Sequence, residues 1–246
     1  MQHFKLLTFN IHKGYNLGNR EQTLSSLKNS IAQNPIDFLF LQEVIGDHQH
    51  PKNEIKNFIS NAQYHYLAED IYPYFHYGKN AVYQKGHHGN AILSKHELEF
   101  EDNLNLSLTR LEQRGMLHLT TTLNEKKINL LCTHLNLRHP HRIEQVEKII
   151  YYINKKIDPT EALILCGDFN DWTAHLSKIF FHRLKLKEAS QEYHGKHLKT
   201  FPAFVPLLPL DRIYYRNLNI TFTKVMLESE WKKISDHLAI YAEFTF

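Results

Sequence analysis

The chain has 246 residues, a formal net charge of +3, 42% hydrophobic residues and 22% charged residues, as in ordinary globular proteins. Its two cysteines, Cys132 and Cys166, each lie inside an apolar run, which predicts buried reduced thiols and argues against a disulfide framework. No apolar run approaches the roughly 20 residues that cross a bilayer, and the first residues do not form a signal peptide. We therefore expect a cytoplasmic protein, although secretion without a cleaved signal would leave no mark in the sequence. The mildly basic charge permits a polyanionic partner without requiring one.

The first 94 residues are predicted to alternate strands with helices. Short apolar runs that end at turn residues favour buried strands, whereas apolar residues spaced three and four apart favour a helix face. Strands are expected at Phe4 to Ile11, Asp37 to Leu41 and Ala91 to Ser94, and the aromatic-rich residues 64–83 are predicted to form a strand, a loop and a second strand. Helices are expected between a cap at Asn19 and Pro35, and from Pro51 to Ala62.

The rest of the chain is predicted to be richer in strands. These are expected at Gln113 to Leu123, Ile128 to His134, Ala162 to Cys166, Asp211 to Tyr215, Ile220 to Glu228 and Leu238 to Phe246. Helices are expected from Pro140 to Ile153 and from Trp172 to Leu184, and the polar residues 188–199 are predicted to be irregular. Prolines exclude a helix or a central strand in residues 200–210. This order is consistent with one domain, residues 1–246, in which two sheets pack face to face with helices outside.

Several of these strands end next to a polar side chain. The residues at these positions are Asn10, Glu43, His134, Asp168, Asn170, Asp236 and His237, and Asp211 opens a further strand. Each residue alone also has a structural explanation, because an asparagine suits a turn and a strand-end histidine is often a hydrogen-bonded core residue. A carboxylate directly after a buried strand, by contrast, must be solvated or bound to a partner. If the whole set converges, it describes a site that cleaves a phosphate ester.

The residue types in this set suit metal-assisted hydrolysis. A hard divalent cation binds carboxylate oxygens and retains water, which suits Glu43 together with Asp236. Such a cation would polarise phosphoryl oxygens and neutralise developing charge. His237 would accept a proton from water near neutral pH if Asp211 orients its ring. Amides such as that of Asn10 can donate to a phosphate or fix a water without adding negative charge.

Arginines near the predicted site are candidates for binding further phosphates. Arg138 and Arg142 flank Pro140 at the start of a predicted helix, where a positive charge opposes the helix dipole but favours an anion. A solvated basic turn is the alternative explanation for this pair. Arg114, with Arg110 just upstream, opens a predicted strand. We expect Arg114, Arg138 and Arg142 to contact the substrate, since arginine binds phosphate well.

The polar residues lie in six short motifs: Thr8-Phe9-Asn10-Ile11, Leu41-Gln42-Glu43-Val44, Cys132-Thr133-His134-Leu135, Gly167-Asp168-Phe169-Asn170, Leu210-Asp211-Arg212-Ile213 and Ser235-Asp236-His237. In their order along the chain, these motifs resemble the signatures of the endonuclease/exonuclease/phosphatase superfamily, which includes deoxyribonuclease I and sphingomyelinases. The resemblance implies a four-layered α/β sandwich and a phosphoesterase that depends on Mg²⁺, with Mn²⁺ as the alternative. Residues 9–15 and 206–214 look most like small uncharacterised bacterial members.

The resemblance also implies roles for individual residues. Glu43 would be the main metal ligand, with Asn10 and Asp236 beside it. His237, paired with Asp211, would be the catalytic acid or base.

Three further residues would act directly at the reacting group. By the same resemblance, Asp168 and Asn170 would position the attacking water and the phosphate, and His134 would contact the phosphate. Whether Asp168 or His237 takes the water proton, and whether one or two metal ions bind, stays open at this point.

The sequence indicates the substrate only in outline. A chain of 246 residues leaves little room for a long insertion that clamps DNA, so we favour a phosphodiesterase or phosphatase that acts on a small or lipid phosphoester over an enzyme that acts on nucleic acid. The apolar Thr200 to Leu210 segment leads into Asp211 and either contacts a lipid or an aromatic base or packs under the sheet. A DNA or RNA nuclease and a catalytically inactive binding module are the alternatives, and the inactive module is disfavoured because no expected polar position is replaced. No protein partner is indicated.

Overall fold

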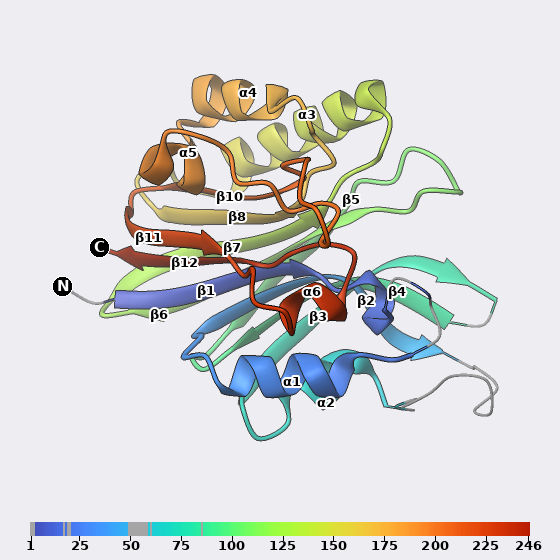
Figure 1. Ribbon diagram of the computed structural model, residues 1–246. Coiled ribbons are helices and arrows are strands. Elements are labelled where there is room, and N and C mark those ends of the chain that lie inside the picture. The colour runs from blue at the N-terminus through green and yellow to red at the C-terminus, as the bar shows by residue number, and fades with distance from the viewer. Residues whose placement is uncertain (1–2, 17, 19–20, 49–58, 60, 85) are drawn as a thin grey trace.

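The computed structural model describes residues 3–16, 18, 21–48, 59, 61–84 and 86–246, which form two six-stranded β-sheets with helices on their outer faces (Figure 1). The strand order is β11-β12-β1-β2-β4-β3 in the first sheet and β5-β6-β7-β8-β10-β9 in the second. The pairs β1/β2 and β7/β8 are parallel and the other pairs are antiparallel, so both sheets are mixed. The predicted four-layered α/β sandwich is confirmed.

The strands of each sheet come from both halves of the chain. The first sheet contains β1 (His3–Asn10), β2 (Phe38–His48), β3 (Tyr74–Tyr83), β4 (Gly86–Ser94), β11 (Asn219–Val225) and β12 (Ile240–Thr245). The second sheet contains β5 (Glu99–Asn105), β6 (Gly115–Leu123), β7 (Lys126–His134), β8 (Ala162–Asp168), β9 (Lys187–Glu188) and β10 (Asp211–Arg216).

The two sheets pack against each other through one apolar core. Successive side chains of a strand point to opposite faces, so Leu6 of β1 lies between the sheets whereas Leu7 faces the helices. Ile164 of β8 likewise faces the other sheet. Cys132 and Cys166 lie opposite each other on β7 and β8 in this layer, both as buried free thiols. The expectation of reduced, buried cysteines is therefore confirmed.

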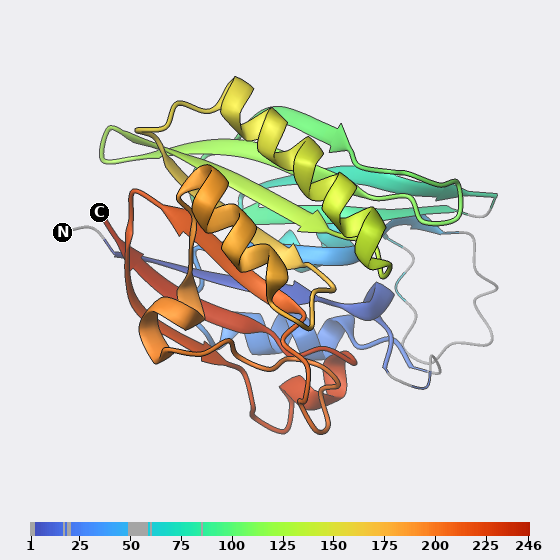
Figure 2. The same cartoon turned by 90° about the horizontal axis from the view of Figure 1, so that it is seen from above.

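Helices cover the outer face of each sheet (Figures 1 and 2). Against the first sheet lie α1 (Leu24–Ala32), α2 (Gln63–Ala68) and α6 (Trp231–Ile234), and against the second lie α3 (His139–Lys156) and α4 (His175–Leu184). The inward stripe of α3 includes Val146, Ile149 and Ile153, which are fully buried. Each such side chain contributes about 1.5–3 kcal/mol through burial, which fixes the helix on the sheet. None of the helices in the described part of the chain is long and apolar enough to cross a membrane.

The topology places the termini and the polar strand ends at opposite edges of the sandwich. His3 at the start of β1 pairs with Thr245 near the end of β12, so the two ends of the chain lie close together (Figure 1). Asn10 is at the other end of β1, and β2 runs parallel to β1 from the same direction. In the second sheet His134 and Asp168 end the parallel strands β7 and β8. The carboxyl ends of parallel strands are a common place for ligand sites.

Two segments differ from the sequence prediction. Residues 64–83 contain one helix, α2, and one strand, β3, where two strands were expected. The aromatic residues that suggested a strand belong partly to the helix: the ring of Tyr64 in α2 stacks on that of Tyr77 in β3 at 4.8 Å. Residues predicted to be irregular form β9 and α5 (Ala189–His194). Glu188 accounts for that helix, since its carboxylate accepts hydrogen bonds from the backbone of Ser190 and Gln191.

Other predicted elements are matched or fall outside the described residues. The apolar stripe of Leu24, Leu27 and Ile31 is buried in α1. The expected cap at Asn19 and most of the expected helix in residues 51–62 lie outside the described residues. The short elements β5, α6 and a 3-10 turn at His12–Gly14 were not predicted.

Candidate active site

Adjacent strand ends bring the predicted polar residues of the second sheet together. In the strand register, Asp168 at the end of β8 is the partner of His134 at the end of β7 and also of Asp211 at the start of β10. Glu43 is placed differently, because β2 has a bulge between Leu41 and Val44 and Glu43 adopts a φ of 58°. A bulge adds a residue to one strand and re-aims its side chains, and this one lies just past the end of β1, whose last residue, Asn10, pairs with Gln42.

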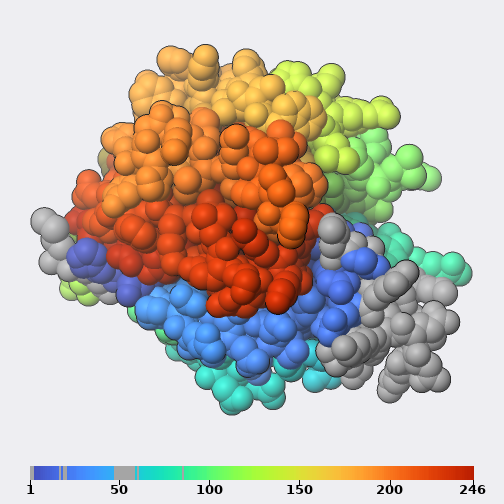
Figure 3. All heavy atoms as spheres, in the orientation of Figure 1, coloured from blue at the N-terminus to red at the C-terminus, as the bar shows by residue number. Residues whose placement is uncertain are grey.

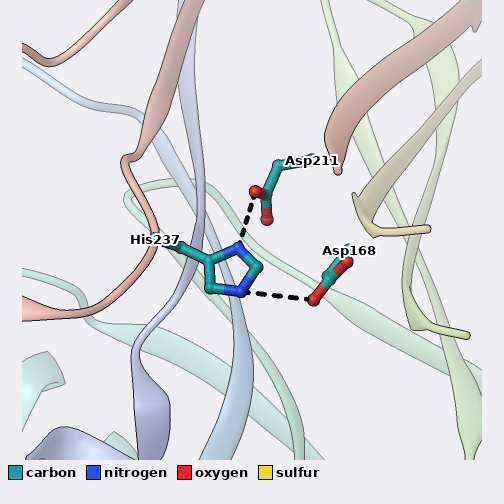
Figure 4. A group of neighbouring side chains, drawn as sticks. All are labelled: Asp168, Asp211 and His237. Atoms are coloured by element: carbon teal, nitrogen blue, oxygen red, sulfur yellow. Dashed lines mark hydrogen bonds and ion pairs between the residues drawn. The ribbon is translucent and has the colours of Figure 1, made fainter. Parts of the chain in front are cut away.

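A histidine–aspartate pair lies at the centre of the site (Figure 4). His237 Nδ1 and Asp211 Oδ2 are 2.8 Å apart, and the hydroxyl of Thr200 donates to the same oxygen at 2.6 Å. The backbone N–H of His237 donates to Ser235 Oγ at 3.2 Å, and the ring of Phe201 packs against its imidazole. The ring is thereby held by Asp211 and Phe201, and the backbone of His237 is held by Ser235. The second ring nitrogen, Nε2, faces the carboxylate of Asp168.

Asp168 is almost fully buried and joins both halves of the site. Its Oδ2 atom accepts a hydrogen bond from Asn10 Nδ2 at 3.0 Å and lies 3.7 Å from His237 Nε2. The same oxygen is 3.4 Å from His134 Nε2. Its Oδ1 atom accepts the backbone N–H of Asn170 at 2.9 Å, which shapes the turn after β8. One carboxylate therefore contacts the ends of β1 and β7, the loop before β12 and the turn that follows its own strand, β8.

His134 extends this cluster to Glu43. The side-chain amide of Asn170 lies 3.2 Å from His134 Nε2 and donates to the carbonyl oxygen of Leu135 at 3.0 Å. On the other side of the ring, His134 Nδ1 is 3.9 Å from Glu43 Oε1, which is beyond hydrogen-bond distance. A continuous series of close pairs thus runs from Glu43 through His134 and Asp168 to His237, so the expected convergence of these groups is observed.

Asp236 joins the site through a residue that the sequence prediction did not assign to it. His12 Nδ1 lies 3.2 Å from Asp236 Oδ1, and the backbone N–H of His12 donates to Asn10 Oδ1 at 3.0 Å. Ser235 donates to the carbonyl oxygen of Asn10 at 2.7 Å, which connects the last loop to the end of β1. The only sequence signal for His12 was its place two residues after Asn10 at a strand end.

Burial and neighbouring charges shift the protonation of the buried groups. Burial raises the pKa of Asp168 to about 6, although His237 opposes the shift. Burial alone would lower the pKa of His237, but the carboxylates of Asp211 and Asp168 outweigh it and raise that pKa to about 10. Burial, with Arg114 adding to it, lowers the pKa of His134 well below its usual range. Two histidines of one site are therefore driven in opposite directions.

The donor set fits a hard divalent cation. The carboxylates of Glu43 and Asp236 keep 19% and 17% of their side-chain surface exposed, so each can be approached by a ligand from solvent. Asn10 uses its amide oxygen for one hydrogen bond and retains a second lone pair. Both cysteines lie in the core between the sheets, which leaves oxygen and imidazole ligands at the site. Oxygen donors of this kind suit Mg²⁺ or Mn²⁺.

A second set of possible ligand atoms overlaps the histidine–aspartate pair. Asp168, Asp211 and His237 each offer one such atom, and these atoms lie within 4.8 Å of one another. His237 Nδ1 is already hydrogen-bonded to Asp211, however, and the remaining contacts of the ring are fixed by packing. We therefore regard this trio as candidate acid–base groups. The Oδ1 atom of Asp211 is buried and has no hydrogen-bond partner among the described residues.

The three predicted substrate arginines occupy different environments. Arg114 precedes β6, is partly exposed and acts electrostatically on His134. Arg138 is exposed just before α3. Arg142 is only 1% exposed, and its guanidinium lies 4.8 Å from the centre of the Trp172 ring. The structure therefore places Arg142 in a wall next to the site, apart from the histidine–aspartate pair.

Two supporting contacts have no counterpart in the sequence prediction. Thr200 contacts Asp211 from a segment that had been considered only for its apolar character. Arg212 forms a buried ion pair with Asp171 at 3.3 Å, and this pair ties the loop after Asn170 to β10. No periodicity signals such pairs, because each depends on which loops meet at the end of the sheet.

The amino-acid sequence from residue 7 to residue 237 matches the family model described as the Endonuclease/Exonuclease/phosphatase family. The chain belongs to this family. A relative of the same length class, the Escherichia coli K12 protein named "Uncharacterized protein YbhP", is 36% identical over 242 residues, covering 98% of this chain and 95% of YbhP. The resemblance found in the six motifs is thus confirmed.

Solved structures of other proteins share the fold. An endonuclease/exonuclease/phosphatase from Beutenbergia cavernae superimposes with a TM-score of 0.80 at 17% identity, over 100% of this chain and 72% of that protein. A family protein from Leptotrichia buccalis gives 0.77 at 19% identity, over 99% and 100% of the two chains. TDP2 of D. rerio, solved with a single-strand DNA product, gives 0.75 at 18% identity, over 100% of both chains.

Proposed function

We propose that the protein is a hydrolase of phosphodiesters that depends on a divalent cation. The observation that carries this proposal is the His237–Asp211 pair, held at 2.8 Å, whose free imidazole nitrogen faces the buried carboxylate of Asp168. Membership of the family supports a phosphoester substrate. Glu43, Asp236 and Asn10 would hold the cation, Mg²⁺ or Mn²⁺, which when bound would polarise the phosphoryl oxygens.

The protein side chains would then position and deprotonate the attacking water. Asp168 Oδ2 and His237 Nε2 lie 3.7 Å apart and both face the same space, so one water can contact both. We assign removal of its proton to the carboxylate of Asp168, because the raised pKa of His237 keeps that imidazole protonated near neutral pH; His237, held in place by Asp211, would be the acid of the pair. Asn170, whose amide nitrogen lies 3.2 Å from His134 Nε2, would hold the imidazole of His134 in place, and His134 would contact the phosphate from the other side.

An exposed apolar segment favours a lipid or other amphipathic substrate. Phe204 is 82% exposed and Leu207 is 58% exposed, so the tip of the 200–210 segment does not pack under the sheet. The same segment is anchored at the site, because Thr200 contacts Asp211 and the ring of Phe201 contacts His237. The C-terminal part of the chain, orange to red in Figure 3, forms a large share of the face of the molecule shown there. A lipid phosphodiester could therefore approach along an apolar surface.

The test compares hydrolysis of bis(p-nitrophenyl) phosphate by the wild type, Glu43→Gln and His237→Gln, with Mg²⁺ or with a chelator. We expect activity only for the wild type with the cation, and at least a hundredfold loss in each variant. Equal rates for all three proteins would favour the inactive binding module. Phospholipid vesicles and single-stranded DNA then compare the substrate classes, and a steep loss of DNA affinity with rising salt would favour a nuclease.

A further inference from the structure

A separate cationic pocket lies between the N-termini of α3 and α4. It has a volume of about 380 Å³ and is lined by His139, Arg142, Trp172, Thr173, His175 and Lys178, among others. Both helices follow strands that end at the candidate active site: α3 follows β7 and α4 follows β8. Only one residue separates Asn170 from Trp172, so the pocket adjoins the catalytic cluster along the chain.

The charge of the pocket is positive and unbalanced. Arg142 and Lys178 are cations, and the imidazoles of His139 and His175 contact each other at 5.7 Å between ring centres. None of the described residues that line the pocket is acidic. The nearby carboxylate of Asp171 is already engaged, because it pairs with Arg212 and accepts the backbone N–H of Leu176 at 2.9 Å.

The helix ends add to this potential. The 18-residue α3 and the 10-residue α4 both start at the pocket, and neither has an acidic residue in its first turn. A helix N-terminus carries about half a positive charge, so basic residues there are unfavourable unless an anion is bound. Backbone N–H groups at such an end are ready donors to phosphate oxygens.

Arg142 provides an independent indication of a ligand. Its side chain lines the pocket although the residue is only 1% exposed. One terminal nitrogen donates to the backbone oxygens of Asn136 and Leu137, whereas Nε is buried and has no hydrogen-bond partner among the described residues. Buried donors are normally paired, and an unpaired guanidinium donor in a cationic wall suits an anionic ligand.

We propose that this pocket binds a second phosphate group, carried by the same substrate molecule as the phosphate that is cleaved. Its ligand is therefore an organic bisphosphate, either two successive phosphates of a nucleotide chain or a phosphorylated head group. The half-exposed ring of Trp172, 47% exposed, forms one side of the pocket and can lie against a base or a sugar ring. The proposal that the pocket holds part of the substrate rests on the function proposed above. The proposal that the pocket binds phosphate does not depend on that function.

The first experiment measures binding of inorganic phosphate without catalysis. Phosphate is titrated into the full chain in the presence of a chelator, by calorimetry and by tryptophan fluorescence. The second tryptophan, Trp231, is only 2% exposed, so a phosphate-dependent fluorescence change should disappear in Trp172→Phe. The double variant Lys178→Gln/His175→Gln should raise the Kd at least tenfold, the expected loss for charge-assisted hydrogen bonds. The matched control Lys155→Gln, near the other end of α3, should stay within twofold.

Either of two results would overturn the pocket assignment. One is a wild type that binds no phosphate by calorimetry, and the other is a double variant that binds phosphate as tightly as the wild type. Because no step of this titration involves hydrolysis, a protein that binds phosphate here but cleaves no phosphodiester would refute the proposed function alone.

The second experiment determines which class of substrate carries the second phosphate. The KM is measured for the p-nitrophenyl ester of thymidine 5′-phosphate with and without a 3′-phosphate, and for the corresponding ester of inositol 1-phosphate with and without a 4-phosphate. We expect the second phosphate to lower KM in at least one pair, and the double variant to remove that advantage while Lys155→Gln keeps it. If the thymidine pair responds, the second phosphate belongs to a nucleotide chain. If the inositol pair responds, it belongs to a phosphorylated head group. If neither pair responds to the second phosphate, the pocket does not serve the substrate.

Discussion

The ion pair between Arg212 and Asp171 offers a quantitative test of the site's architecture. The two side chains are 1% and 0% exposed, and their charged atoms are 3.3 Å apart. At an effective dielectric constant of about 20, this distance corresponds to roughly 5 kcal/mol of attraction. Asp171 also accepts hydrogen bonds from Leu176 N at 2.9 Å and Thr173 Oγ1 at 3.0 Å. These bonds would still stabilise the carboxylate without Arg212 and so reduce the loss of stability. We therefore expect Arg212→Met to cost about 3–5 kcal/mol in free energy of unfolding.

A double-mutant cycle separates the pair from the general effect of truncation. Urea unfolding at pH 7 is measured for the wild type, Arg212→Met, Asp171→Asn and the double variant. Because the single variants each leave a buried group without its partner, we expect the double variant to be at least about 2 kcal/mol more stable than the sum of the single losses predicts. A coupling energy near zero, or a loss below about 1 kcal/mol for Arg212→Met, would show that water screens the pair and would refute the reasoning.

Three further predictions concern the site, the cation and pH. Thr200→Val removes a 2.6 Å hydrogen bond to Asp211 and should lower kcat roughly ten- to hundredfold in steady-state assays, whereas Thr223→Val, which loses an equally buried hydroxyl, should keep kcat within about threefold. Mg²⁺ at 100 times its Kd should stabilise the wild type by about 2.7 kcal/mol in thermal unfolding, and Glu43→Gln should abolish this gain; an equal gain in both proteins would place the ion elsewhere. Burial lowers the pKa of His118 from 6.5, so the unfolded chain gains a proton there that the folded chain does not. Stability should thus fall as pH drops below about 6.5, by at most about 1.4 kcal/mol per pH unit from this residue, and His118→Gln should have a shallower pH profile; an unchanged profile would contradict this origin.

The fold and most of the site could be anticipated because they depend on local patterns. Buried strands appear as apolar runs, and a polar residue at the end of a run marks the point where the strand leaves the core. Asn10, His134 and Asp168 fit this rule and meet in the structure. Glu43 needed the family motif as well, because its position depends on a bulge that apolar periodicity does not report.

The contacts that could not be anticipated join loops distant in sequence. Thr200 reaches Asp211, and His12 reaches Asp236 across 224 positions of the chain, only after both sheets have formed. The burial of Arg142 under Trp172 is of the same kind, since an arginine at a helix start is normally solvated. Such pairs are set by tertiary packing, which leaves no local signature in the sequence.

The reactivity of the two cysteines can report how often the two sheets separate. Cys132 and Cys166 sit side by side between the sheets with no exposed surface, and burial raises the pKa of both thiols. An alkylating reagent can reach either sulfur only when β7 and β8 lose their cover from the opposite sheet. The labelling rate therefore reports how often the layers separate, and slower labelling with cation or phosphate present would register ligand binding without any substrate.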